Sequence, residues 1–213
     1  MSTSVEFNSK YDVPAYMAEG VERALNQIAA SGVRWSGTER VEIANIARAA
    51  KARTPRPDHT VSHEVAALAE ALATHAHSIT EENVDAFAEN SGRGAEAFVE
   101  MIGIVARVVA IDTFATGIGA DLIAFPDPDP SPPSGETREA ARKRSAFVPT
   151  VGPAGATTAL SAVQSEDRAQ EDLHGSLYLS YFEMGDLHIN KGLPRWQLEL
   201  IAARTSLIND CYF

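Results

Sequence analysis

The sequence has little cysteine, few basic residues and no long apolar run. Its single cysteine, Cys211, excludes an internal disulfide and is compatible with a reducing cytoplasm. Lysine and arginine together number 18 against 29 acidic residues, which gives a formal net charge of −11. Because phosphate groups are bound by basic faces, this balance argues against a nucleic-acid partner and against an anionic membrane surface.

No stretch predicts a membrane span or a secretory signal. The longest apolar run, residues 98–111, is interrupted by Glu100 and Arg107, so it does not read as a membrane helix. Residues 1–10 are polar and lack the apolar core of a signal peptide. We therefore expect a cytoplasmic protein.

The composition that is present favours an all-α fold. Hydrophobic residues make up 45% of the chain and charged residues 22%, which is typical of globular proteins. Alanine is abundant and runs of β-branched residues are few, which favours helix over strand. A chain of 213 residues is long enough to bury a full core in one or two domains.

Helical spacing of apolar residues is clearest in the first 120 residues. Thr38 reads as an N-cap, Pro55 and Pro57 end the helix that follows it, and Ser78 or Thr80 reads as another helix start. The most apolar segment, 94–119, reads as one long helix. The sequence therefore predicts helices over residues 13–31, 38–53, 60–77, 80–90 and 94–119.

The remainder of the chain has weaker signals. Residues 125–133 contain five prolines, which predicts an extended, exposed linker, and we expect a mostly irregular chain from there to about residue 172. Residues 174–184 read as a short helix, and residues 1–12 read as a flexible arm.

The last stretch, residues 193–213, organises the functional interpretation. Pro194 suits the first turn of a helix. Glu199 and Cys211 are twelve positions apart, so on one helix they would lie about 18 Å apart, too far for direct contact. One face of this helix is apolar and is made of Leu198, Ile201, Ala202, Thr205 and Ile208.

This stretch resembles the active-site helix of the carboxymuconolactone decarboxylase / alkylhydroperoxidase D-like (AhpD-like) superfamily. That pattern is a Glu, eleven residues, Cys-x-x-Cys, and a His four positions later. Glu199 and Cys211 match the Glu and the first Cys, and Ala203-Arg204 matches the small-Arg pair between them. The second Cys and the His are absent, because the sequence ends one residue before the second Cys would fall.

The resemblance implies catalytic roles for Glu199 and Cys211. Glu199 would be one end of a proton relay, and Cys211 would be the resolving thiol. The ordinary alternatives are a surface acid stabilised by the helix dipole and a terminal cysteine without its partner. The resemblance also implies homo-oligomers, and a thiol reductant protein as a further partner.

A weak internal repeat extends the resemblance to the first half of the chain. Residues 40–55 are similar to residues 195–211, with Glu42 at the position of Glu199 and Ala47-Arg48 near that of Ala203-Arg204. The predicted organisation is a Cys-less AhpD-like unit over 13–124, a proline- and glycine-rich linker over 125–172, and the start of a second unit over 173–213.

Metal and cofactor chemistry receives little support. His59 and His63 are four positions apart, a spacing that binds zinc on a helix, with Asp58, Glu64 or His174 as further ligands. No HExxH pattern accompanies them, and polar surface histidines are the ordinary explanation. The segment around Gly152 and Gly155 lacks the lysine of a phosphate loop. We therefore expect neither a metal nor a cofactor.

Two functions follow from these observations. The first is an alkylhydroperoxidase-like protein of antioxidant thiol-peroxidase ancestry, inactive as this chain without the second Cys and the His. The alternative is a non-catalytic helical protein that oligomerises or binds a small ligand. In either case we expect the final helix to pack onto the helical core, with a homo-oligomeric interface nearby.

Overall fold

The computed structural model describes residues 5–208, and these residues form helices and no strand, which confirms the all-α fold. Two of the helices are single 3-10 turns, η1 and η2, and the others are α-helices. In chain order they are α1 (Ala15–Ala29), α2 (Gly37–Ala52), α3 (His63–Thr74), η1 (Ala76–Ser78), α4 (Glu81–Asn90), α5 (Ala95–Gly117), η2 (Ala156–Thr158), α6 (Gln164–Leu177), α7 (Tyr181–Met184) and α8 (Arg195–Ile208).

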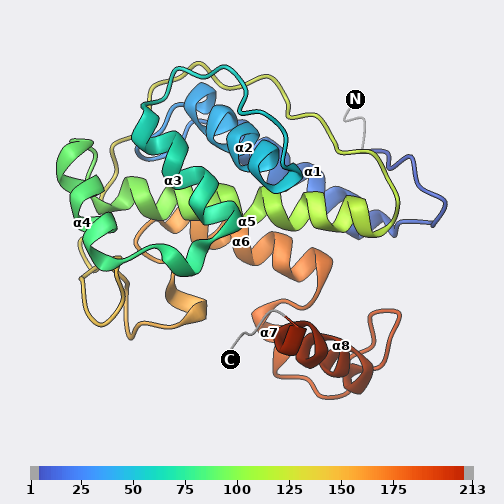
Figure 1. The fold of residues 1–213 in the computed structure, drawn as a ribbon. Helices are drawn as coiled ribbons and strands as arrows, with labels where there is room; N and C mark the ends of the chain where they lie inside the picture. Colours follow the sequence, from blue (N-terminus) through green and yellow to red (C-terminus); the bar gives the residue numbers. More distant parts are fainter. Residues whose placement is uncertain (1–4, 209–213) are drawn as a thin grey trace.

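The bundle is built around α5, which runs through its middle (Figure 1). Helices α1, α2, α3, α4 and α6 all pack against it. The long apolar helix predicted over 94–119 is thereby confirmed, with its ends shortened by one and two residues. Its fully buried side chains form much of the core and include Phe98, Met101, Ile104, Val108 and Ile111.

Capping side chains set where the short helices begin. Thr80, one of the two predicted helix starts, caps α4 through a capping box with Asn83, and the alternative Ser78 does not. Helix α2 is capped by Ser36, whose hydroxyl accepts from the amide of Glu39, so the predicted cap at Thr38 is wrong by two positions. Helix α3 is capped by Ser62 and is shorter at both ends than the predicted segment 60–77.

The segment expected to be irregular ends earlier than predicted. Helix α6 begins at Gln164, whereas the sequence predicted a mostly irregular chain to about residue 172. The predicted helix 174–184 is also wrong, because the chain leaves helical geometry at Tyr178 and starts α7 at Tyr181. Helix α6 is mostly polar but buries one side against α1 and α5, which is why apolar spacing failed to reveal it. Its buried residues are Glu166, Ala169, Leu173 and Ser176.

The proline-rich segment has no regular secondary structure, yet it is fastened to the bundle. The amide of Asp129 donates to the carbonyl of Ala29 at 2.8 Å. The amides of Ser134 and Gly135 donate to carbonyls in the α1–α2 connection, each at 2.9 Å. A Cβ at Gly37 would lie 2.3 Å from the carbonyl oxygen of Ala29, the atom that accepts from Asp129. Glycine at position 37 therefore permits this close approach. The segment is therefore a strap across the bundle.

The N-terminal segment also packs on the bundle where it is described. The ring of Phe7 meets the ring of Phe114 edge-on, with centroids 5.5 Å apart. The hydroxyl of Ser9 donates to the carbonyl of Ile118 at 2.8 Å. Residues 5–12 therefore lie against the end of α5 and do not form the free arm that the sequence predicted.

Helix α8 lies apart from the bundle, below α6 in Figure 1, and α7 adjoins the end of α6, where the amide of Tyr181 donates to Glu171. Helix α8 has no buried residue, and its Trp196 and Leu207 are 65% and 71% exposed. Ile201 and Ile208, predicted to face the core, are exposed as well, while Leu198 and Ala202 are half-buried. The expectation that this helix packs onto the core of its own chain is wrong, because none of its residues is buried.

Candidate functional site

Glu199 lies on the second turn of α8 and is held by two side chains. Its Oε1 atom accepts a hydrogen bond from the hydroxyl of Tyr178 at 3.1 Å and another from Nε of Arg195 at 2.8 Å. Arg195 is fixed in turn by donating to the carbonyl of Glu183 on α7 at 3.1 Å. The side chain of Glu199 remains 51% exposed, so the carboxylate is oriented and accessible at once.

A group of aromatic side chains continues from Glu199 towards α6. The ring of His174 meets the ring of Tyr178 edge-on at 5.5 Å and lies 6.2 Å from the ring of Tyr181. Burial, followed by the hydrogen bond to Glu199, raises the pKa of the Tyr178 hydroxyl. Tyr178 therefore stays protonated over the neutral range and acts as a hydrogen-bond donor to the carboxylate.

Three buried polar atoms on α6 have no hydrogen-bond partner among the described residues. They are Oε1 of Gln170, Oε2 of Glu171 and Nδ1 of His174. The other carboxylate oxygen of Glu171 accepts from the amide of Tyr181 at 2.7 Å. Unpaired buried polar atoms are rare in folded proteins. Helix α6 thus has hydrogen-bonding capacity that no described residue uses.

Of the two site residues predicted from the sequence, the structure places one. Cys211 lies outside the described residues, so its position relative to Glu199 is not part of the geometry above. Tyr178 and Arg195 were missed, because a lone tyrosine and an arginine carry no motif. The one sequence signal for Arg195 was its position four residues before Glu199, the spacing of a helical ion pair.

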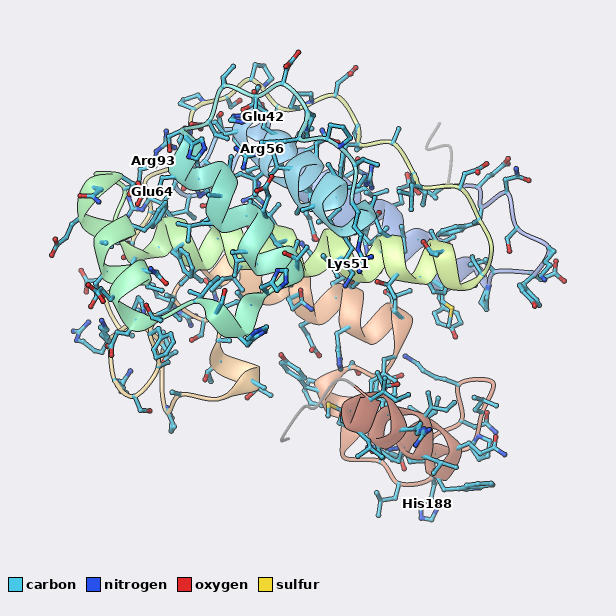
Figure 2. All side chains as sticks on the ribbon, viewed as in Figure 1. Glu42, Lys51, Arg56, Glu64, Arg93 and His188 are labelled. Carbon is cyan, nitrogen blue, oxygen red and sulfur yellow. The ribbon has the colours of Figure 1, made fainter. Side chains whose placement is uncertain are left out.

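Glu42, the counterpart of Glu199 in the first half of the chain, has a structural task. Its carboxylate accepts from the amide and the hydroxyl of Thr60 and from the amide of Val61, at 2.9 to 3.0 Å. Figure 2 shows Glu42 at the top of the bundle, far from α8. It therefore fastens the loop before α3 to α2, and no thiol-bearing residue lies beside it in the sequence.

The histidines with zinc-like spacing do not share a helix face. His63 is the first residue of α3, whereas His59 lies in the preceding loop with Nδ1 at 2.9 Å from the carbonyl oxygen of Val61. Across residues 5–208, no cluster of three or more His, Cys, Asp or Glu side chains has an arrangement that could hold a metal ion. In the same range, none of the helices is both long and apolar enough to cross a membrane.

The most buried charges form a network that the sequence analysis did not foresee. Arg40 of α2 pairs with Glu100 of α5 and, at 2.9 Å, with Glu166 of α6. Arg107, two turns after Glu100 on α5, pairs with the other oxygen of Glu166 at 2.5 Å. All four side chains are at most 2% exposed, and their formal charges cancel. Glu100 and Arg107, which interrupt the apolar run, were its one visible signal.

Tight packing encloses this network and fixes its protonation. A Cβ at Gly103 would lie 2.4 Å from Oε2 of Glu166, so only glycine lets α6 approach α5 there. Burial opposes ionisation of Glu166, but the nearby Arg107 and Arg40 outweigh it and hold its pKa below the ordinary value. With one arginine beside it, Glu100 has its pKa raised by burial. The network joins α2, α5 and α6 and has no access to substrate.

Comparisons of the chain with protein families, with curated proteins and with solved structures found no match. The fold and the site by themselves define an all-α protein whose helix α8 carries an oriented, accessible glutamate, Glu199. The AhpD-like resemblance remains a prediction from Glu199, Cys211 and the residues between them.

Proposed function

We propose that this chain is an alkylhydroperoxidase-like (AhpD-like) protein of antioxidant thiol-peroxidase ancestry, and that α8 carries the glutamate of its site. The observation that carries the proposal is the fixing of the Glu199 carboxylate by Tyr178 and Arg195 on an exposed helix. An exposed acid with no task would gain little from two such hydrogen bonds. A proton relay requires this orientation.

The chemistry assigned to the site needs two thiols and a base. A thiolate attacks the O–O bond of the hydroperoxide and becomes a sulfenic acid, while the alcohol leaves. The second thiol condenses with the sulfenic acid, releases water and leaves a disulfide, which a dithiol reductant returns to two thiols. Glu199 is one end of the proton relay that takes up the proton lost by the attacking thiol, and other groups carry the proton across the distance between them. Cys211 is the resolving thiol of this scheme.

The coding sequence directly after the codon of Phe213 tests this proposal. A codon for cysteine at the next position, or an in-frame UGA codon read as selenocysteine, would support it if a histidine codon follows four codons later. A reading frame that continues without these two residues, or one that stops directly after Phe213, would contradict it. The second candidate function below does not depend on this outcome.

The second candidate function is assembly through α7 and α8. Of the fourteen large apolar side chains that are exposed within residues 5–208, ten lie between residues 181 and 208. These ten are Tyr181, Phe182, Met184, Leu187, Leu193, Trp196, Leu200, Ile201, Leu207 and Ile208. Globular proteins rarely expose many large apolar side chains within one short segment unless a partner covers them, so this segment favours a protein partner.

Charge indicates that the partner is a second copy of this chain. Residues 1–177 contain 25 acidic and 15 basic residues, whereas residues 178–208 contain three of each. Two bundles with this acidic excess repel each other, but two neutral apolar segments do not. Joining copies through residues 178–208 therefore covers the apolar surface and keeps the acidic bundles apart.

Sedimentation velocity tests the assembly candidate. We expect the wild type to sediment as a dimer or a larger symmetric oligomer, and the double variant Leu200→Gln/Ile201→Gln to shift towards monomer. Phe147→Gln, which changes an exposed apolar residue outside the segment, is the matched control and should leave the distribution unchanged. A wild type that stays monomeric at about 100 µM, a concentration well above the dissociation constant of a stable dimer, would rule out self-assembly.

A further inference from the structure

Lys51 stands at the end of α2 beside α5 without a partner (Figure 2). Among the described residues, no side chain or carbonyl accepts a hydrogen bond from its ammonium group or forms an ion pair with it. Most other cations of this acidic protein are paired: Arg48 with Asp112, Arg56 with Glu70 and Lys143 with Glu81 and Asp85. Lys51 is therefore one of the cations within residues 5–208 whose charge no ion pair offsets.

Lys51 borders a cavity between the ends of α2 and α5, which we call the α2–α5 groove. The groove has a volume of about 490 Å³, within the range of small-molecule sites. Its walls are mainly carbon: the side chains of Ala52 and Leu122, the helix surface at Gly117 and the methyl groups of Thr113 and Thr116. Leu122 is 44% exposed at its edge, so apolar surface faces the opening.

The groove carries one uncompensated positive charge. Both oxygens of Asp112 are occupied by Arg48, through Nε and Nη2 at 2.8 Å each. The guanidinium of Arg48 also stacks 4.2 Å from the ring centre of Phe125 in the strap, which fixes the pair in place. The charges of Arg48 and Asp112 cancel, so the positive charge of Lys51 is the net charge of the groove.

The other side of Lys51 reinforces this charge. A second cavity of about 650 Å³ is lined by Lys51, Arg53, Thr54 and His75, and its one acid, Glu70, is bound by Arg56 at 2.7 Å. Arg53 has no ion-pair partner within residues 5–208. The ammonium group thus lies between an apolar groove and a polar, electropositive cavity, which is the arrangement that an amphiphilic anion requires.

We propose that the α2–α5 groove binds a small anionic amphiphile, a carboxylate with an aliphatic chain. The carboxylate pairs with Lys51, and the chain lies against Ala52, Gly117 and Leu122. Burial of the chain supplies the affinity, and the ammonium group selects for the anion. The site is separate from Glu199 and does not depend on the function proposed for α8.

Isothermal titration calorimetry of the 213-residue protein with octanoate tests the proposal. We expect one-to-one binding with a dissociation constant of about 1 mM or tighter, which suits a ligand of this size. Acetate, which has the head group alone, should bind at least tenfold more weakly, as should octan-1-ol, which has the chain alone. Equal affinity for acetate and octanoate would show a simple anion site and overturn the proposal.

Two variants locate the ligand. Lys51→Met keeps the aliphatic stem, removes the charge and should weaken octanoate binding about tenfold. Lys10→Met, which removes an exposed lysine of the N-terminal segment, is the matched control and should change nothing. Gly117→Leu fills the groove without a clash, since no atom lies within 4 Å of the position of a Cβ there, and should abolish binding.

Three results would overturn the proposal. The first is the absence of octanoate binding to the wild type at 10 mM, roughly tenfold above the weakest affinity expected. The second is unchanged affinity in Lys51→Met. The third is binding that survives Gly117→Leu and is lost in Trp196→Ala, because the amphiphile would then occupy the exposed surface of α8.

Discussion

Glu166 offers the sharpest perturbation of the fold. Its carboxylate lies between two guanidinium groups, at 2.9 Å from Arg40 and 2.5 Å from Arg107. Glu166→Gln keeps the size of the side chain and one acceptor oxygen. The amide nitrogen that replaces the other oxygen carries N–H groups, and these would face the N–H groups of a guanidinium with no acceptor between them. The buried network, neutral in the wild type, then carries one positive charge.

The expected loss is large, because a buried charge loses its partner. Breaking a buried ion pair by changing one member costs about 3–5 kcal/mol. We therefore expect urea unfolding of Glu166→Gln to give a free energy of unfolding lower than that of the wild type by about this amount. The control is Asp172→Asn, which disturbs the solvent-exposed pair with Arg23 and should cost about 0–1 kcal/mol.

The pH dependence follows from the lowered pKa of Glu166. Stability from a carboxylate of this kind is fully present above its unfolded pKa, ordinarily 4.5, and is lost as the pH falls through the lower folded pKa. Glu100, with a raised pKa, acts in the opposite direction and loses its contribution as the pH rises. The wild type should therefore lose its advantage over Glu166→Gln below pH 4.5. A difference between them of less than 1 kcal/mol at pH 7 would refute the role of the network, since exposed pairs reach that value.

Three further predictions concern the remaining parts of the chain. The 213-residue polypeptide should show no appreciable hydroperoxide reduction with dithiols, since Cys211 is its single cysteine, and turnover that disappears in Cys211→Ser would contradict this. Limited proteolysis should cut residues 139–158 and 185–193 before the strap at 125–135, whose amides are hydrogen-bonded to the bundle; earlier cleavage in the strap would be inconsistent with that attachment. Deletion of residues 195–213 should leave the melting temperature within about 2 °C, because α8 buries no residue, and a loss of 8 °C would indicate packing on the bundle.

The sequence predicted best where local chemistry decides the structure. The cap at Thr80 and the apolar length of α5 follow from residues within one helix. Helix α6 was missed because it buries a carboxylate, and Glu166 becomes a core residue only when Arg40 and Arg107 come from helices distant in sequence. The local pattern showed only that Glu100 and Arg107 interrupt an apolar run, and it gave no sign of Glu166.

The candidate site was predicted in the same uneven way. Glu199 was identified through the resemblance of its helix, and Arg195 could have been found by its four-residue spacing. Tyr178 could not, because its contact with Glu199 depends on the break between α6 and α7. The packing of α8 was predicted wrongly, since an apolar face indicates that a helix will be covered and does not say by which surface.

Where the coding sequence continues past Phe213 with the second Cys and the His, hydroperoxide reduction by that longer product tests the central claim most directly. With cumene hydroperoxide and a dithiol reductant, the account predicts turnover that falls about 100-fold in Glu199→Gln, the magnitude typical of a lost proton-transfer group. Tyr178→Phe should lower the rate less and alter its pH profile, while Asp186→Asn, an exposed acid on the α7–α8 loop, should match the wild type. No turnover, or equal rates for Glu199→Gln and the wild type, would contradict the assignment of Glu199 to a thiol-peroxidase site.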